Sequence, residues 1–204
     1  PYEENVAKTR EIVEYAHRHK VDVEAELGAV GGSAIETGGG ADIKSTQTDP
    51  KQARDFVART KVDALAISFG NSHGKYKGKP KLNLPLVREI ASRVDVPLVM
   101  HGASGLTNED YGRVIDAGIS KINYYTTMGL SSAENIRRKT ASAGENLVCH
   151  KIVKWNIDFI QQETTDLLTL LRCTGKAPGI LNGSSRDNRS KAVDKQLPRI
   201  VSED

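Results

Sequence analysis

The chain has 204 residues, of which 38% are hydrophobic and 27% are charged, and its formal net charge is +3 at pH 7. This balance predicts a globular chain that is long enough for one sizeable domain with a hydrophobic core, and it excludes a protein that is disordered throughout. Because the Lys and Arg residues form no long run and no apolar stretch approaches about 20 residues, we expect neither a nucleic-acid interface nor a membrane span.

The first elements in chain order are a helix and a strand. Apolar residues at helical spacing among many charges predict a helix over residues 3–20, and the alternation of apolar and acidic residues over 21–28, VDVEAELG, predicts a strand. A Gly-rich segment over 31–40 predicts a loop. Asp49 and Pro50 mark the start of the next helix, since Asp is a favoured N-cap and Pro suits the first turn.

The rest of the chain repeats the unit of strand and helix and then becomes helical. The remaining predicted elements are a strand over 63–70, a polar loop over 71–81, a helix over 82–93, a strand over 96–102, a helix that opens at a Thr107–Asp110 capping box, a strand over 120–126, and an amphipathic helical stretch from about 130 to 171. The residues after this stretch are rich in Gly, Ser, Asn and charge and predict a disordered tail.

The alternation of four strands with helices predicts an α/β fold built from parallel βαβ units. A (β/α)8 TIM barrel has eight such strands in about 250 residues and carries its active site at their carboxyl ends. The four strands therefore predict half of a barrel, in a partial barrel domain over 1–130. A C-terminal helical region of the same domain over 131–173 and a disordered tail over 174–204 complete the predicted organisation.

Polar side chains lie at the ends of all four predicted strands. They are Glu26, His73, His101, and Asn123 with Thr126. His73 and His101 are 28 residues apart, which is one βα repeat, so we expect them at adjacent strand ends. Two imidazoles that converge at a barrel mouth can bind a divalent metal, although a histidine at a strand end that is only hydrogen-bonded is the alternative.

Small residues follow the third predicted strand. Gly-Ala-Ser-Gly over 102–105 precedes the helix that Thr107 caps. Small residues expose backbone N–H groups, and a helix N-terminus favours phosphate, so this turn is a candidate phosphate site. An ordinary Gly-containing turn between a strand and a helix is the alternative, and the segment alone does not decide between the two.

Four segments together resemble the class II fructose-bisphosphate and tagatose-bisphosphate aldolases, in the order of that family and over roughly residues 1–130. The segments are VEAELG, SFGNSHGKYKGKPKL, VPLVMHGASG, and KIN with a following Thr. The resemblance implies the C-terminal half of a TIM barrel in which His73 and His101 are two of three histidine ligands of a catalytic Zn²⁺. Glu26 matches an acid that in some members binds a second or alternative metal position, with a buried acid paired within the barrel as the alternative.

The resemblance also implies contacts with dihydroxyacetone phosphate. The implied substrate and phosphate contacts are Gly74, Gly102, Ala103, Ser104, Asn123, Tyr124, Tyr125 and Thr126. Within this set, Tyr124 and Tyr125 depart from the family pattern, which usually has an aliphatic residue and then a small or acidic one.

The implied reaction is the reversible, zinc-dependent cleavage of fructose or tagatose 1,6-bisphosphate to dihydroxyacetone phosphate and glyceraldehyde 3-phosphate, as in glycolysis and related carbohydrate metabolism. No segment before Glu26 resembles the family motif that carries the third histidine ligand and the proton-transfer Asp. We therefore expect this chain alone to be an inactive fragment. A non-catalytic, truncated aldolase-like protein that binds metal or phosphate only, and another phosphate-binding barrel enzyme, are the alternatives.

The expected surroundings of the protein follow from the same features. The first residues show no charged-then-apolar signal pattern, and Cys149 and Cys173 have neither close pairing nor metal-ligand spacing, so we expect a cytoplasmic protein with free thiols. The expected partner is a small-molecule sugar bisphosphate. The resemblance further implies a homo-oligomer in the intact protein.

Overall fold

A parallel sheet lies at the centre of the molecule in the computed structural model, which describes residues 1–32, 46–74, 80–144, 147–176 and 201–202. The strands of this sheet, in spatial order, are β1 (Glu24–Leu27), β3 (Ala64–Ile67), β5 (Leu98–Met100), β6 (Ile119–Asn123) and β7 (Val201–Ser202). All four pairings between these neighbours are parallel. The predicted α/β fold with four parallel strands alternating with helices is confirmed, and β7 extends the sheet beside β6.

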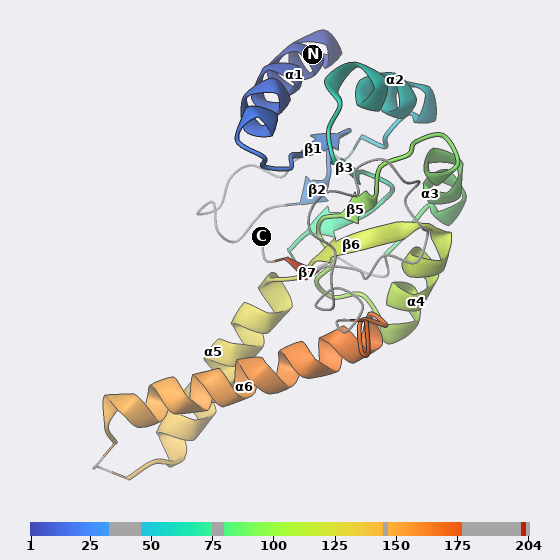
Figure 1. Cartoon of the computed structure of the whole chain (residues 1–204). Helices are drawn as coiled ribbons and strands as arrows, with labels where there is room; N and C mark the ends of the chain where they lie inside the picture. Colours follow the sequence, from blue (N-terminus) through green and yellow to red (C-terminus); the bar gives the residue numbers. More distant parts are fainter. Residues whose placement is uncertain (33–45, 75–79, 145–146, 177–200, 203–204) are drawn as a thin grey trace.

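Four helices follow one another in an arc along one side of the sheet, one before β1 and the other three between successive strands of the sheet (Figure 1). They are α1 (Tyr2–Arg18), α2 (Pro50–Thr60), α3 (Leu84–Ala91) and α4 (Asn108–Ala117). The side chain of Asp49 accepts hydrogen bonds from the backbone N–H groups of Lys51 and Gln52, which confirms it as the cap of α2. The predicted capping box of α4 is also present, since Thr107 and Asp110 each bind the backbone of the other.

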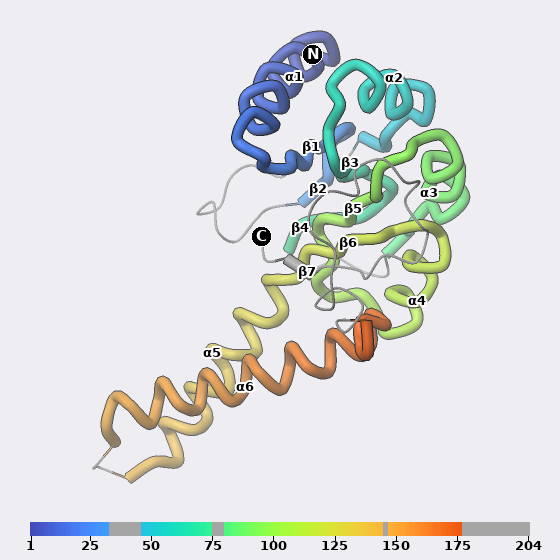
Figure 2. Tube along the Cα trace, in the orientation of Figure 1, coloured from blue at the N-terminus to red at the C-terminus, as the bar shows by residue number. Residues whose placement is uncertain are grey.

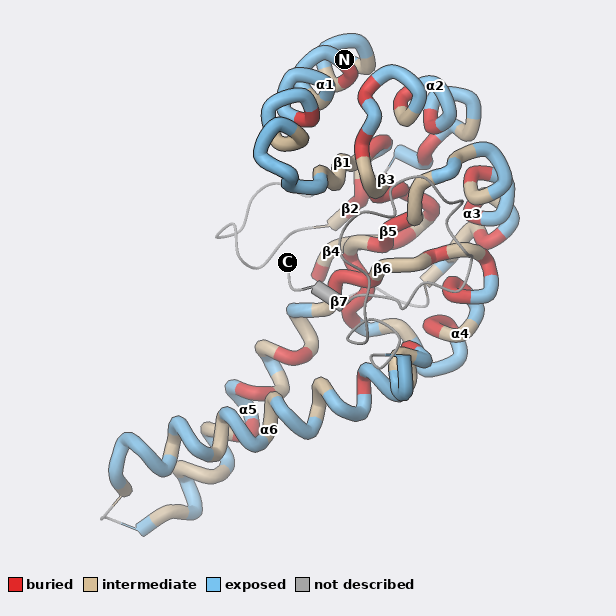
Figure 3. Tube along the Cα trace, in the orientation of Figure 1, coloured by how far each residue is buried: buried red, intermediate tan, exposed pale blue. Residues whose placement is uncertain are grey.

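The hydrophobic core fills the space between the sheet and these helices, where Figure 3 shows buried residues along the strands and on the inward sides of the helices. Alternation along β3 divides its side chains between two faces. Leu65 and Ile67 belong to the core cluster, together with Phe56 of α2 and Val87 and Ile90 of α3. Ala66, between them, is fully buried but lies outside this cluster, on the opposite face of the sheet.

The expected helical stretch from about 130 to 171 is two helices rather than one. They are α5 (Thr126–Ser142) and α6 (Cys149–Leu170), which lie side by side and extend away from the sheet (Figures 1 and 2). α5 ends where Ala143 adopts an extended conformation, with φ −83° and ψ 136°, just before Gly144. The predicted strand over 120–126 was correspondingly too long, because Thr126 is already the first residue of α5.

The C-terminal end of α6 returns to the body of the fold. Leu167 and Leu171 are buried and join the core cluster. Beyond the helix, Arg172 forms an ion pair with Asp116 of α4, with 2.6 Å between Nη1 and Oδ1. The tail predicted over 174–204 falls mainly outside the described residues. Among the helices that the structure describes, none combines the length and apolar character needed to cross a bilayer.

The central position of β3 makes its core residues the strongest test of this packing. Leu65 is 0% exposed, so we expect Leu65→Ala to lower the free energy of unfolding by about 2–5 kcal/mol, through lost apolar burial and a residual cavity. The matched control is Ile12→Ala on α1, where the side chain is 56% exposed and the expected change is within about 0.5 kcal/mol. Urea unfolding followed by circular dichroism measures both, and equal effects would contradict the core described here.

Candidate metal centre and substrate site

The candidate site lies at the carboxyl ends of the parallel strands, where residues far apart in the sequence meet. Glu24 and Glu26 are two residues apart on β1 and therefore point to the same face of the sheet. His101 directly follows β5, and His73 belongs to β4 (Ser72–His73). Parallel pairing aligns these ends at a single edge, as the alternation of strands and helices predicts.

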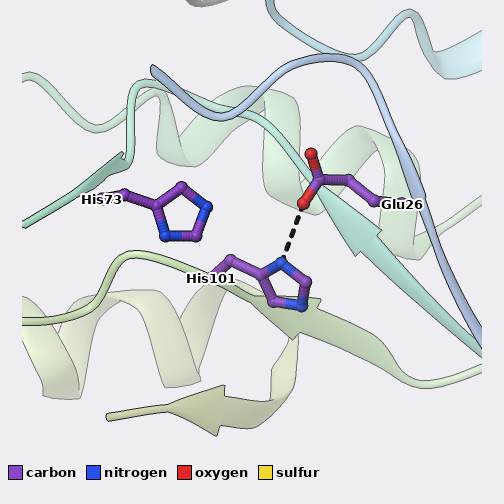
Figure 4. Close-up of side chains that lie close together, drawn as sticks. All are labelled: Glu26, His73 and His101. Carbon is purple, nitrogen blue, oxygen red and sulfur yellow. Dashed lines mark ion pairs between the residues drawn. The ribbon is translucent and has the colours of Figure 1, made fainter. Parts of the chain in front are cut away.

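Glu26, His73 and His101 form a compact cluster with the donor types that metal ions accept. One ligand atom from each side chain lies within 4.8 Å of the others. The two imidazole rings have centroids 6.1 Å apart, and Glu26 Oε2 lies 2.8 Å from His101 Nδ1. Figure 4 shows the three side chains directed toward a shared space. Two imidazoles and a carboxylate fit a zinc ion, which takes nitrogen and oxygen ligands at about 2.0–2.2 Å.

A short parallel pairing that the sequence analysis assigned to loops holds His73 in place. β2 (Gly31–Gly32) pairs with β4, so that Gly32 lies opposite His73. The Ser72 hydroxyl donates a hydrogen bond of 3.0 Å to the carbonyl oxygen of Gly31. The second strand of this pair therefore places His73 beside the segment that follows Glu26.

Asn71 joins the two histidine-bearing segments and was missed by the sequence analysis. Its side chain is 1% exposed and donates to the carbonyl oxygen of His101 at 2.9 Å. It also accepts a hydrogen bond of 2.8 Å from the backbone N–H of Phe69. An amide that satisfies backbone groups of both segments fixes their relative position. Its place in the motif that carries His73 was the only signal for it.

Glu24 and Lys121 are two further site residues that the sequence analysis missed. Glu24 Oε1 lies 2.9 Å from His101 Nε2, and Glu24 Oε2 lies 3.0 Å from Lys121 Nζ. Lys121 also donates to the side-chain oxygen of Asn123 at 2.7 Å. The available signal was period-two alternation, because Glu24 shares a strand face with Glu26 and Lys121 shares one with Asn123.

Both carboxyl groups remain ionised because their contacts outweigh their burial. Burial raises the pKa of Glu24, but hydrogen bonds from His101 and Lys121 and the charges of both partners bring the pKa below its ordinary value. Burial likewise raises the pKa of Glu26, and the hydrogen bond and charge of His101, the backbone of Val30 and the charge of His73 lower it further than burial raises it. The stability that these contacts contribute is present at neutral pH and is lost as the pH falls through the lowered pKa values.

The small-residue turn after β5 lies next to the start of α5. Ala103 and Ser104 are buried, at 1% and 4% exposure. The Ser104 hydroxyl accepts a hydrogen bond of 3.2 Å from the backbone N–H of Thr127, in the first turn of α5. Thr126 opens that helix, so the structure brings it to the turn after Gly102. Backbone N–H groups at such a helix N-terminus suit an anion.

The remaining members of the predicted substrate set differ in where they lie. Asn123 ends β6 and is buried, and Gly74 follows His73 with a φ of +74°. Tyr124 packs against the core instead, with its ring centroid 6.4 Å from that of Tyr111 on α4. Burial raises the pKa of Tyr124. Tyr125 is 38% exposed. The structure thus joins the turn to the start of α5 through Ser104 and Thr127, and packs Tyr124 beside Tyr111, whose hydroxyl donates to the carbonyl oxygen of Ala103 at 2.7 Å.

Comparison with known proteins identifies similar sequences and folds. The family model described as fructose-bisphosphate aldolase class-II matches residues 1–176. The D-tagatose-1,6-bisphosphate aldolase subunit GatY of Klebsiella oxytoca is 44% identical over 138 residues, which are 67% of this chain and 48% of the relative. The chain therefore spans about half the length of this curated relative.

Two solved structures share the fold. The YdjI aldolase from Escherichia coli K12 matches with a TM-score of 0.72 and 31% identity, over 87% of this chain and 59% of the other. The fructose-bisphosphate aldolase (Fba) from Campylobacter jejuni matches with a TM-score of 0.67 over 85% of this chain and 58% of the other. Since the second is 19% identical, that likeness concerns the fold alone.

The close approach of the two histidine-bearing segments generates a prediction at Gly102. Its φ is +64°, and a Cβ added there would lie 2.4 Å from the carbonyl oxygen of Ser72. We expect Gly102→Ala to lower the free energy of unfolding by about 1–3 kcal/mol, because the backbone conformation is strained for alanine and Ser72 must move.

The matched control is Gly112→Ala inside α4, where the nearest atom to an added Cβ is Arg172 Nη2 at 3.6 Å. A helical position favours Ala over Gly, so the expected change is a gain of about 0.5–1 kcal/mol. Denaturant unfolding measures both variants. A neutral result at Gly102 would show that the two segments are not packed as closely as described.

Proposed function

The chain belongs to the class II fructose-bisphosphate aldolase family, and we propose that it contributes two histidines and a substrate cradle to the zinc-dependent, reversible cleavage of a ketose 1,6-bisphosphate. The family match over residues 1–176 confirms the resemblance seen in the four sequence segments. The observation that carries the proposal is the convergence of Glu26, His73 and His101 at the carboxyl edge of the sheet. The products would be dihydroxyacetone phosphate and glyceraldehyde 3-phosphate.

His73 and His101 would hold the zinc ion, and Glu26 offers a carboxylate to it or to a second cation. The chemistry that zinc supplies when bound is polarisation of the substrate carbonyl. Glu26 now contacts Nδ1 of His101, so this acid and the metal would compete for the same nitrogen. Glu26 would therefore move from an ion-pair partner of His101 to a neighbouring position when the ion binds.

The substrate phosphate would lie at the turn after β5, against the backbone of Gly102, Ala103 and Ser104 and the N-terminus of α5 at Thr126. Gly74 permits close approach from the His73 side. Asn123, whose side-chain oxygen accepts from Lys121, would donate from its amide NH2 to a substrate oxygen. These contacts fix the three-carbon unit beside the two histidines, and such positioning is a large part of a rate enhancement.

The names of the relatives support a ketose bisphosphate as the substrate class. The stereochemistry of the sugar is a question for an activity assay. The curated relative is named for tagatose 1,6-bisphosphate, and the family model for fructose bisphosphate. No described contact distinguishes the two sugars, so both belong in the test. Homo-oligomerisation, a cytoplasmic location and a role in glycolysis stay predictions.

Zinc binding is the direct test of the paired histidines. We expect His73→Ala or His101→Ala to weaken zinc binding by at least about tenfold, because each removes one nitrogen ligand. Titration of the chain against a chromophoric chelator measures the affinity. His150→Ala, an exposed histidine on α6, is the control and should leave the affinity unchanged. Equal affinities for all the variants and the parent would remove the metal role proposed here.

Turnover by the 204-residue chain tests the expectation of an inactive fragment. Among the described residues, the cluster that could hold a metal has two histidines and no Asp, whereas the family mechanism adds a third histidine and a proton-transfer Asp. A lost proton-transfer group costs about 10²–10⁴-fold in rate. We therefore expect no turnover above background when dihydroxyacetone phosphate release is coupled to a dehydrogenase, with zinc and either bisphosphate.

Rates typical of an enzyme, about 1–10³ per second, would contradict this expectation. Activity that disappears on dilution would indicate that a second polypeptide supplies the missing groups. Zinc binding without turnover, in contrast, is the result that the described site leads us to expect.

A further inference from the structure

A continuous set of polar contacts crosses the inner face of the sheet, which is the face that points away from the core and the helices. These contacts link the metal cluster to Asn123. It runs from His101 Nε2 to Glu24 Oε1 at 2.9 Å, from Glu24 Oε2 to Lys121 Nζ at 3.0 Å, and from Lys121 Nζ to Asn123 Oδ1 at 2.7 Å. The side chains of His101, Glu24 and Lys121 are 18%, 26% and 23% exposed. The set therefore lies mostly out of water.

The strands between the two ends leave room for these contacts. Parallel register places Glu26 opposite Ala66, Ala66 opposite Val99, and Val99 opposite Lys121, so these four side chains form one row on the inner face. Glu24 lies one step along β1, opposite Ala64. Ala64 and Ala66 of β3 and Val99 of β5 are short side chains, so the long side chains of β1 and β6 meet above these two strands.

Partly buried charges of this kind seldom repay their desolvation as stability alone. Apolar residues of similar size often stabilise a fold equally well, whereas removing one partner from such a network leaves the other uncompensated. A set of charges retained beside a candidate metal centre is therefore a candidate for orienting the groups at that centre. The contacts identify which groups these are.

The first oriented group is His101. A neutral imidazole carries one proton, and the nitrogen without it is the one that binds a metal. Glu24 accepts at Nε2, which holds a proton at that nitrogen, so Nδ1, whose proton Glu26 accepts in the metal-free chain, is the nitrogen that a metal would take in the cluster. Glu24 thus determines which nitrogen of His101 faces the cluster.

The second oriented group is the carboxamide of Asn123. Lys121 is a donor only, so its contact with Asn123 must be made by the carboxamide oxygen. That contact fixes which end of the carboxamide is oxygen and which is NH2. Lys121 also contacts Glu24, so one ammonium group connects the orientation of the amide with that of the imidazole.

We propose that Glu24 is a positioning residue for His101 and Lys121 a positioning residue for Asn123, and that together they couple the metal cluster to the substrate amide. The proposal rests on the proposed function, since it assigns a purpose to contacts around that site. Neither residue touches substrate in this scheme. Each acts through the group that it holds.

The first experiment compares Glu24→Gln with Asp63→Asn in the full 204-residue chain. Asp63 Oδ2 lies 2.8 Å from His17 Nε2 and is about one-third exposed, so its variant removes a chemically similar contact away from the site. We expect Glu24→Gln to weaken zinc binding by about 10–100-fold, the range for a lost carboxylate partner of a metal-binding histidine. Asp63→Asn should leave zinc affinity unchanged while altering stability to a similar degree.

A second readout needs no metal and separates this proposal from the proposed function. Nitrogen-15 NMR of the histidine rings in the metal-free chain reports which ring nitrogens of His101 carry a proton and a hydrogen bond. We expect the signal of a protonated, hydrogen-bonded Nε2 in the parent and a displaced Nε2 signal in Glu24→Gln, with His17 perturbed only in Asp63→Asn. An unchanged His101 spectrum in Glu24→Gln would overturn the positioning role. Failure of the parent to bind zinc would instead overturn the proposed function and leave the NMR test in force.

Lys121→Met tests the second half of the proposal, the positioning of Asn123 by Lys121. Because this variant leaves Glu24 in place, it still gives a test if Glu24→Gln fails to fold. The methionine preserves the bulk of the stem but cannot donate to Asn123. We expect binding of dihydroxyacetone phosphate to the zinc-loaded chain, measured by calorimetry, to weaken by about fivefold or more, the equivalent of one hydrogen bond. Lys121→Arg, which retains a donor, should restore part of the loss. Unchanged binding in Lys121→Met would show that Lys121 only neutralises Glu24.

Discussion

Charged side chains on the inner face of a parallel sheet impose the constraint on which the candidate site depends. Glu24 and Glu26 on β1 and Lys121 on β6 are held in surroundings where each needs a partner, because an uncompensated buried charge is costly. His101, between them, contacts both acids through its two ring nitrogens. The position of the imidazole follows from this balance of charges as much as from the end of β5 that carries it.

The backbone holds the second histidine by different means. His73 lies on a two-residue strand, and its place depends on pairing with Gly32, on Asn71 and on the packing of Gly102 against Ser72. None of these contacts involves charge. One histidine is thus oriented by an electrostatic network and the other by main-chain packing, which makes the two sensitive to different kinds of substitution.

The sequence predicted those features that rest on local physics. The helix starts at Asp49 and Thr107 were found because a cap is a contact between residues two or three apart, and the core strands were found because alternation is visible in a short window. The resemblance to the class II aldolases identified the family from four segments. Pairing of β2 with β4 escaped prediction, since two residues carry no periodicity. Glu24 and Lys121 escaped it because their contact joins strands that are not neighbours in the sheet.

The alanines of β3 have a consequence for how this protein can change over evolutionary time. Ala66 is fully buried and separates β1 from the strands that carry His101 and Lys121, yet it contributes no polar group. A larger side chain at residue 66 would occupy the space in which Glu24 and Lys121 now meet. A larger residue is therefore tolerated there only if smaller residues replace Glu24 or Lys121 at the same time. The size of residue 66 is therefore under selection although its methyl group takes no part in the chemistry. We expect residues 24, 66 and 121 to covary among homologous chains.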